Sequence, residues 1–202
     1  MKPGTDPKPM NRGPFPMPRL GMGTWHMGES AATRAAEVAS LRLGLELGMG
    51  LIDTAEMYPV PPSAQTQGRT ESYLGSWLKH RSRDKLLVAT KITAQGRGFN
   101  WVRGGPGPID RRSIQQALDG SLARLQTDYV DLYQIHWPDR YLPLFGNTFY
   151  DPKQERVATP IEIVIGRCSH SSASMQARSR SAISPAVLPS HPGRTSTNSS
   201  PP

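Results

Sequence analysis

The chain has little cysteine and no long apolar run, and each absence excludes a class of protein. Cys168 is the only cysteine in 202 residues, so neither a disulfide framework nor a cysteine metal site is available. No stretch reaches the roughly 18 to 20 apolar residues of a spanning helix, and the amino terminus has no apolar signal core. The five histidines show no metal-ligand spacing. We therefore expect a soluble, cytoplasmic protein with no metal site.

Both ends of the chain lack the composition of a packed domain. Residues 163–202 contain no Asp, Glu, Phe, Tyr or Trp and are rich in Ser, Arg and Pro, while residues 1–17 are a polar lead with many prolines. Neither segment can bury enough apolar surface to offset the entropy lost on ordering. We predict that both are disordered and that residues 18–162 form the folded part.

The formal net charge of +8 describes the end of the chain as much as its folded part. Four arginines lie in the acid-free residues 163–202, which leaves +4 for residues 1–162. No aromatic residues alternate with these arginines to stack on bases, so specific nucleic-acid binding is not expected. Weak, salt-sensitive contact with polyanions is the most that this segment supports.

Short apolar runs alternate with helical periods between residues 18 and 162. This alternation predicts repeated strand–helix units with a parallel sheet. The expected strands cover residues 19–25, 49–53, 86–91 and 129–136. The expected helices begin after Ser30, at Thr70 as N-cap, and after Asp110; the first closes at Gly48 and Gly50, the second runs through His80, and the third carries its last apolar residue at Leu125.

A further helix start is followed by sequence that is not helical. Thr159-Pro160-Ile161-Glu162 combines an N-cap, a proline at the first helical position and a capping-box glutamate. Ser-rich sequence without a sustained period follows it. We interpret this as a departure from the ancestral reading after about Glu162, by frameshift, chimeric joining or a gene-model error. The first and fourth strands would then be unpaired edges, which self-association of two half-barrels could cover.

Three of the apolar runs end in a titratable residue. Asp53, Lys91 and His136 hold these positions, and Tyr58 follows Asp53 by five residues. In a parallel barrel, functional residues gather at the carboxyl ends of the strands. Taken singly, these residues have other interpretations: a helix-capping Asp, a solvated Lys, a packed loop Tyr and a core His. Their joint placement favours a common site.

These four side chains have the chemistry needed for an acid-assisted carbonyl reduction. Reduction of a carbonyl creates negative charge on oxygen, which must receive a proton. At about 4 Å and an effective dielectric of about 20, Lys91 would stabilise a phenolate at Tyr58 by about 4 kcal/mol, or about three pKa units. Asp53 would keep a buried Lys91 charged, and His136 could hold the substrate oxygen or assist proton transfer.

The chain resembles the aldo-keto reductases between about Pro18 and Glu162. The resemblance is carried by GMGTW, LIDTAEMY, the Thr90-Lys91 strand end, SLARLQTDYVDLYQIHW and VATPIE, and YPVPP is similar to an NADP(H)-dependent bacterial branch. It implies a (β/α)8 TIM barrel, of which about the first four βα units are present. The family's catalytic tetrad falls on Asp53, Tyr58, Lys91 and His136, with Tyr58 as general acid.

The same resemblance implies how a cofactor and a substrate would be held. NADPH would be the hydride donor, with Gly23, Thr24 and Asp53 at its nicotinamide end. An aldehyde or ketone would be the substrate. The candidates for the substrate mouth are three tryptophans, namely Trp25, Trp101 and Trp137. The Gly-rich segment 96–108 is expected to be a flexible flap over this mouth, on which Arg97 and Arg103 could be simple solubilising charges.

The family's main NADPH grip would come after Glu162, where no matching motif is recognisable. We therefore expect this polypeptide to have impaired activity. The alternative is a non-catalytic, truncated remnant that self-associates or is unfolded, and a third possibility is a regulatory subunit that binds nucleotide. The sequence identifies neither the physiological substrate nor the oligomeric state.

Overall fold

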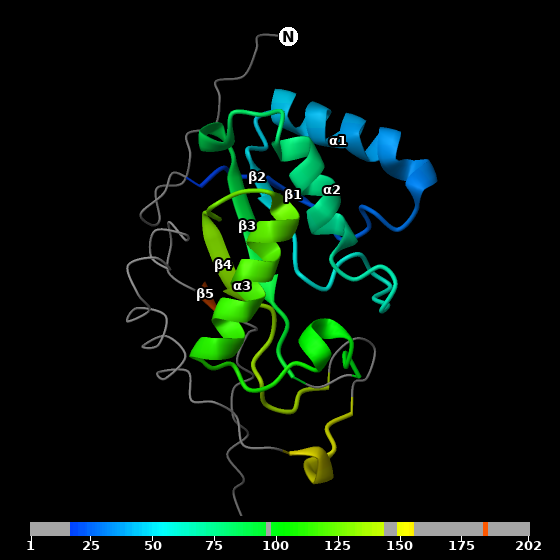
Figure 1. Cartoon of the computed structure of the whole chain (residues 1–202), viewed down its shortest axis with the longest axis vertical. Coiled ribbons are helices and arrows are strands. Elements are labelled where there is room, and N and C mark those ends of the chain that lie inside the picture. The colour runs from blue at the N-terminus through cyan, green and yellow to red at the C-terminus, as the bar shows by residue number, and fades with distance from the viewer. Residues whose placement is uncertain (1–16, 96–97, 144–148, 156–183, 186–202) are drawn as a thin grey trace, which may run out of the picture.

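The fold is a parallel sheet with helices on one side, seen in a computed structural model that describes residues 17–95, 98–143, 149–155 and 184–185. The strands follow the order β1-β2-β3-β4-β5, and every neighbouring pair is parallel. Figure 1 shows α2 and α3 lying next to each other over the sheet, with α1 beside α2. Within the described ranges, no helix has both the length and the apolarity needed to cross a membrane.

The strands are short, and their bounds lie inside the predicted ranges for the first two and the fourth. The five strands are β1 (Gly21–Gly23), β2 (Leu51–Asp53), β3 (Leu87–Ile92), β4 (Leu132–Ile135) and β5 (Ser184–Pro185). Consecutive parallel strands need a crossover, and the three expected helices supply it between β1 and β4. The alternation read from the sequence therefore predicted the order of these elements.

Three α-helices form these crossovers, namely α1 (Arg34–Glu46), α2 (Arg69–Leu78) and α3 (Arg111–Leu125). Ser30 caps a short 3-10 turn, Ala31–Thr33, that leads into α1. α3 begins after Asp110 as predicted, and Asp110 is its N-cap, with its carboxylate accepting a hydrogen bond from the Ser113 amide at 2.8 Å. Three further 3-10 turns are described, at Arg83–Lys85, Val102–Gly104 and Pro152–Gln154.

The predicted start of α2 was wrong by two residues. Gly68, with φ +77°, is the N-cap, and Thr70 lies inside the helix with its side chain fully buried. The Thr70 hydroxyl donates to the Met27 carbonyl at 2.5 Å. Thr70 therefore ties α2 to the loop after β1, because its hydroxyl donates to a distant carbonyl and does not accept from the amides of its own helix.

The core lies between the sheet and the helices. Alternate residues of the strands point into it, as the fully buried Ile52 and Val88 show, and α3 contributes Ile114, Leu118 and Leu125. α2 and α3 approach closely at Gly75, where an added Cβ would lie 2.2 Å from the Arg124 carbonyl oxygen. Burial of these side chains, each contributing about 1.5–3 kcal/mol, holds the helices on one face of the sheet.

These elements form part of an α/β barrel, as predicted. β4 has a partner within the described residues, because Gln134 and Ile135 pair with Ser184 and Pro185. The sequence had left β4 as an unpaired edge and had placed residues 184–185 in a disordered segment, so this pairing differs from both expectations. The predicted helix start at residues 159–162 lies outside the described residues, as do residues 1–16 and the rest of the predicted disordered segment after residue 162.

Candidate active site

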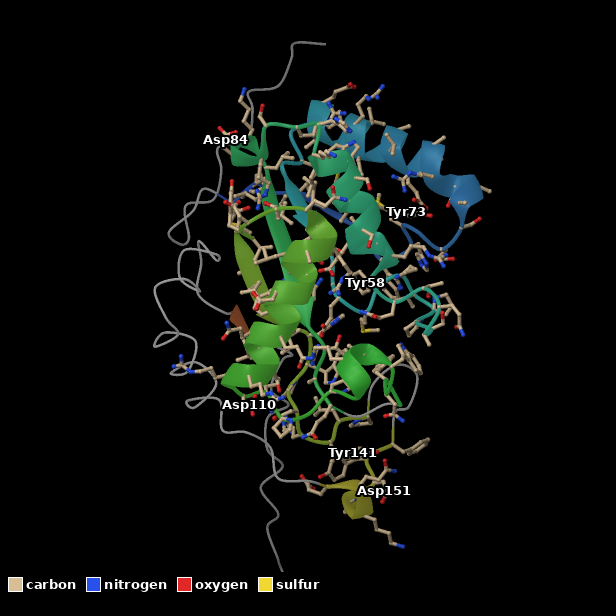
Figure 2. All side chains as sticks on the ribbon, viewed as in Figure 1. Tyr58, Tyr73, Asp84, Asp110, Tyr141 and Asp151 are labelled. Atoms are coloured by element: carbon tan, nitrogen blue, oxygen red, sulfur yellow. The ribbon has the colours of Figure 1, made fainter. Side chains whose placement is uncertain are left out.

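The register of the sheet brings the titratable strand ends to one rim. Gly23 pairs with Asp53, and Lys91 pairs with Gln134, so the carboxyl ends of neighbouring strands lie at similar heights. Backbone hydrogen bonds continue this ladder beyond the strands, from the His136 amide to the Ile92 carbonyl at 3.1 Å. Tyr58 follows in the loop after β2, whereas Asp84 precedes β3 at the other end of the sheet (Figure 2).

Lys91 is held by two acceptors from the neighbouring strand end. Its Nζ lies 2.5 Å from the Asp53 carboxylate and 2.8 Å from the Thr54 carbonyl oxygen. Its side chain is only 12% exposed, so it is not the solvated strand end considered above. Burial lowers the pKa of Lys91, while the charge of Asp53, its hydrogen bond and the charge of Glu71 act in the opposite direction. Asp53 caps no helix and serves as the counterion of this ammonium.

The phenol ring of Tyr58 contacts both the Lys91 ammonium and the His136 imidazole. Lys91 Nζ is 5.2 Å from the ring centroid, and the His136 ring meets the Tyr58 ring edge-on, with centroids 5.6 Å apart. The Tyr58 hydroxyl has no hydrogen bond to any of the described residues. It is thus available to an incoming group.

One ring nitrogen of His136, Nδ1, is buried without a hydrogen-bond partner among the described residues. Its Nδ1 is inaccessible and accepts or donates no hydrogen bond within the described part of the chain, so this is not a satisfied core histidine. The Trp137 ring lies against it, with centroids 4.9 Å apart. Burial, reinforced by the positive charge of Lys91, lowers the pKa of His136 to about 3. The imidazole is therefore neutral at physiological pH.

The predicted effect of Lys91 on Tyr58 is not what the structure shows. From the sequence, Lys91 was predicted to lower the pKa of Tyr58 by about three units, on the assumption of an ammonium about 4 Å from the phenol oxygen. Burial, together with the negative charge of Asp53, instead raises the pKa of Tyr58 to about 12. The estimate failed because it omitted desolvation and the carboxylate that accompanies the lysine.

Two of the residues predicted to hold a cofactor sit beside Asp53 at the end of β1. The Thr24 amide and hydroxyl both donate to the Asp53 carbonyl oxygen, at 3.0 and 2.9 Å, and the side chain is fully buried. Gly23 is exposed, and a Cβ added there would meet no atom within 4 Å. The rim is therefore open at Gly23, whereas Thr24 supports Asp53.

The three tryptophans expected at the substrate mouth differ in exposure. Trp25 and Trp101 are exposed by 51% and 38%. Trp137 is only 4% exposed, and its indole nitrogen donates to the Gln95 carbonyl at 3.4 Å. Trp137 packs between His136 and Phe99, so of the three candidates it is the one that is buried.

Sequence reasoning missed Gln134, whose side-chain amide donates to the second Asp53 oxygen at 2.9 Å. Asp53 is thereby fixed from two sides, by Lys91 and by Gln134. A signal was present, since Gln134 is a polar residue inside an apolar strand and stands two positions before His136, on the same face. The strand-end rule overlooked it because Gln134 is not titratable.

The second missed feature is a buried ion pair between Arg103 and Glu56. The two side chains are 11% and 1% exposed. Arg103 is thus not the simple solubilising charge considered above, since its guanidinium pairs with a buried carboxylate. This pair anchors the segment around Arg103, which was expected to be a flexible flap, while Arg97 lies outside the described residues.

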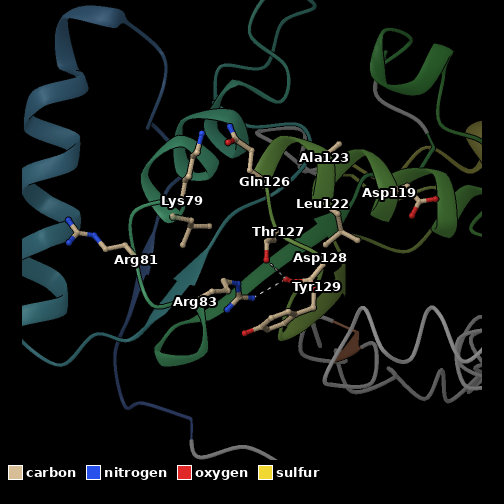
Figure 3. A pocket seen from close by; sticks show the side chains of 11 residues that line it. Lys79, Arg81, Arg83, Asp119, Leu122, Ala123, Gln126, Thr127, Asp128 and Tyr129 are labelled. Atoms are coloured by element: carbon tan, nitrogen blue, oxygen red, sulfur yellow. Dashed lines mark hydrogen bonds between the residues drawn. The ribbon is translucent and has the colours of Figure 1, made fainter.

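A cavity of about 940 Å³ opens at the opposite end of the sheet (Figure 3). It lies where α2 and α3 end, next to the amino-terminal ends of β3 and β4. Its charged lining residues are Lys79, Arg81, Arg83, Asp119 and Asp128. Arg83 is committed to Asp131, at 2.7 Å, and to the Tyr129 carbonyl, at 3.0 Å. Because charges of both signs line the cavity, it favours no single class of ligand and is not part of the candidate active site.

Proteins of known sequence are similar to this chain over about two thirds of its length. Protein tas of Escherichia coli is 48% identical over 132 residues, which are 65% of this chain and 38% of that protein. Methylglyoxal reductase YeaE of Escherichia coli is 42% identical over 125 residues, which are 62% of this chain and 37% of that protein. The chain thus spans less than two fifths of the length of these relatives.

Solved structures agree at the level of the fold. An aldo-keto reductase from Klebsiella pneumoniae in complex with NADPH has a TM-score of 0.57 at 29% identity, covering 85% of this chain and 46% of that chain. The thermostable aldo-keto reductase Tm1743, in complex with the inhibitor epalrestat, has a TM-score of 0.55 at 27% identity, covering 83% and 48%.

The family model described as "Aldo/keto reductase family" matches residues 19–171. This match begins one residue after the predicted start and continues to residue 171, beyond the predicted end at Glu162. It covers more than half of the chain. The chain belongs to the aldo/keto reductase family.

Proposed function

We propose that this chain carries the proton-donating side of an NADPH-dependent carbonyl reductase site, which reduces an aldehyde or ketone to an alcohol. The observation that carries the proposal is the convergence of Tyr58, Lys91, Asp53 and His136 on one rim. Family membership supports oxidoreductase chemistry there. The proposal extends to the roles of the individual residues.

Tyr58 is the proposed general acid. Its pKa of about 12 keeps the phenol protonated throughout the physiological range, so the proton is present when the substrate oxygen becomes negative. The free hydroxyl can approach that oxygen without breaking an existing hydrogen bond to the described residues. After the transfer, the proposed role of the Lys91 ammonium, whose Nζ lies 5.2 Å from the ring centroid, is to offset the charge of the phenolate.

Lys91 and Asp53 form the proposed tuning pair. Asp53 keeps the buried ammonium charged, because its negative charge raises the pKa of Lys91 against the effect of burial. Gln134 holds the other oxygen of Asp53 and so orients the carboxylate. The pair therefore places one positive charge beside the Tyr58 ring without leaving it uncompensated.

His136 is the proposed orienting group for the carbonyl. With a pKa of about 3 it stays uncharged, so it can offer a hydrogen bond without competing with Tyr58 as an acid. Its contacts with Trp137 and Tyr58 fix the ring between two aromatic side chains. We place the substrate beside the exposed Trp25 and Trp101, with Trp137 supporting His136 from behind.

NADPH is the proposed cofactor, and when bound it supplies the hydride. The residues present fit its nicotinamide end, because Gly23 leaves open space at the rim beside Asp53. The relative of known structure from Klebsiella pneumoniae, which is similar over 85% of this chain, is in complex with NADPH. Thr24 would act here by fixing the Asp53 backbone.

Titration of NADPH with the whole chain, followed by cofactor fluorescence, tests the proposal together with turnover of a simple aldehyde. Tyr58→Phe should retain binding and lose about 10²–10⁴-fold in turnover, the contribution typical of a general acid. Tyr73→Phe is the matched control, since Tyr73 lies on α2 against Arg34 and away from the rim (Figure 2). Equal turnover of Tyr58→Phe and the parent would rule out Tyr58 as the acid.

The second candidate is a non-catalytic chain that self-associates. It is favoured by the exposed edge of the sheet, where Leu20, beside β1, is 64% exposed and β1 pairs only with β2 among the described strands. A flat NADPH titration together with a dimeric mass in solution would support this candidate. Between an active reductase and a non-catalytic chain, we propose a reductase whose turnover is reduced.

A further inference from the structure

Arg103 and Glu56 join two loops at the candidate site. Arg103 Nη1 contacts Glu56 Oε1, and Arg103 Nη2 donates to the Thr93 carbonyl oxygen at 3.0 Å. The Thr93 amide also donates to Glu56 Oε1, at 2.5 Å. The guanidinium and the carboxylate each have hydrogen-bond partners, so both charges are compensated although Glu56 is only 1% exposed.

The backbone of Arg103 is strained at the point where its side chain makes the buried pair. Arg103 has φ +53° and ψ +29°, a left-handed conformation that residues other than glycine rarely adopt. Gly104 and Gly105 follow it directly and also have positive φ, +75° and +107°, which glycine adopts without strain. A strained residue persists where the surrounding contacts determine it, and the contacts here are those of the guanidinium.

Glu56 is tied to the segment that carries Tyr58. Its amide donates to the Lys91 carbonyl at 3.4 Å, and its own carbonyl accepts from the Gln67 side chain at 2.7 Å. Tyr58 follows two residues later, after the buried Met57. A displacement of the Glu56 side chain therefore reaches Tyr58 through a short, well-packed piece of backbone.

We infer that the buried pair of Arg103 and Glu56 locks residues 98–105 to the segment carrying Tyr58, which makes Arg103 a positioning residue for the proposed acid. This inference rests on the proposed function, because only there does the position of the phenol matter. Arg103 itself takes no part in proton transfer. Its contribution is to hold Tyr58, and with it Trp101, at a fixed place on the rim.

Hydrogen–deuterium exchange of the whole chain, read by mass spectrometry, tests the lock without requiring turnover. The amides of Tyr58 and Val60 report on one loop, since they donate to the Ala55 and Trp25 carbonyls at 3.1 and 3.0 Å. The Val102 amide, which donates to Phe99, reports on the other. In Arg103→Met, exchange should accelerate by about tenfold or more in both segments.

Two further variants separate the lock from general destabilisation. Glu56→Gln combined with Arg103→Met leaves no unpaired buried charge, and it should fold while both segments still exchange faster. Arg103→Lys keeps the charge without the fork to Thr93, and it should restore part of the protection. Arg83→Met breaks the comparable buried pair with Asp131 at the other end of β3, and it should leave both segments protected.

The inference is overturned if exchange rises only in residues 98–105 while Tyr58 and Val60 keep their protection, or if neither segment responds. Turnover adds a second measurement. Misplacing Tyr58 should lower kcat by about tenfold to a hundredfold and leave the NADPH Kd within about twofold. If the parent chain shows no turnover, the proposed function fails while the exchange experiment still tests the lock.

Discussion

Lys91 on β3 reaches Asp53 at the end of β2, with its Nζ 2.5 Å from a carboxylate oxygen. This pair crosses between adjacent strands and faces the ring of Tyr58. The negative charge of Asp53 raises the pKa of both the lysine and the tyrosine, although the two groups differ in the sign of their ionised forms. Removal of that charge should therefore lower the pKa of both Lys91 and Tyr58.

The first prediction concerns Asp53→Asn. Loss of the carboxylate should lower the pKa of Tyr58 from about 12 toward its ordinary value, with the share due to burial remaining. The pKa of Lys91 should fall further below its ordinary value. Tyrosinate absorbance measured against pH, with the Tyr58→Phe curve subtracted, follows the phenol. Asp84→Asn, at the opposite end of the sheet, is the control (Figure 2), and a Tyr58 pKa that stays at about 12 in Asp53→Asn would contradict the assignment.

The second prediction concerns acid stability and His136. Its folded pKa of about 3 lies below the ordinary 6.5, so the unfolded chain binds a proton first as the pH falls. Stability contributed by the neutral imidazole is complete above about pH 6.5 and is lost progressively toward pH 3. Urea unfolding at several pH values should show a shallower acid decline in His136→Gln. His80→Gln changes an exposed histidine and should follow the parent; identical curves for all three proteins would refute the claim.

The third prediction compares two helical glycines. An alanine at Gly75 would place its Cβ 2.2 Å from the Arg124 carbonyl oxygen, and backbone cannot move aside there. Gly75→Ala should destabilise the fold by about 1–3 kcal/mol or more. At Gly120 the nearest atom is Arg124 Nη1, at 3.2 Å, which need shift by only a few tenths of an ångström although Glu71 and Ser121 hold the guanidinium, so Gly120→Ala should cost less than Gly75→Ala. Denaturant midpoints decide, and equal effects of the two changes would disprove the close helix contact.

The fourth prediction concerns Gln134, the partner of Asp53 that sequence reasoning missed. Gln134→Leu removes a 2.9 Å hydrogen bond to a charged group, which should lower the free energy of unfolding by about 1–2 kcal/mol. Gln115→Leu on the exposed face of α3 is the matched control and should stay within about 0.5 kcal/mol of the parent. A loss no larger than that of the control would mean that Gln134 does not hold Asp53.

The local pattern of the sequence was sufficient for the order of the elements and for the rim. Apolar periodicity predicted β1 to β4 and the three α-helices between them, though not β5, and the positions of Asp53, Lys91 and His136 at the ends of apolar runs followed from it. The reason is physical: in a parallel sheet all carboxyl ends share one edge, so residues from three separate strands meet there whatever lies between them. The start of α3 after Asp110 was equally local.

Features that depend on partners distant in the chain could not be predicted from the local sequence pattern. Thr70 was predicted as a cap from its neighbours in the chain. Its actual acceptor, Met27, was missed because it lies 43 positions away. Arg103 was considered a surface charge because Glu56, its partner, is 47 positions away. Neither spacing is marked by any periodicity.

The sequence by itself determined which residues stand at the strand ends, since side-chain periodicity depends only on neighbours along the chain. Only the tertiary structure decided their electrostatic state. Burial and the proximity of Asp53 set the pKa of Tyr58 at about 12, and burial beside Lys91 set that of His136 at about 3. Desolvation and Coulomb energies depend on what surrounds a group in space, so they are fixed by the fold and not by the motif.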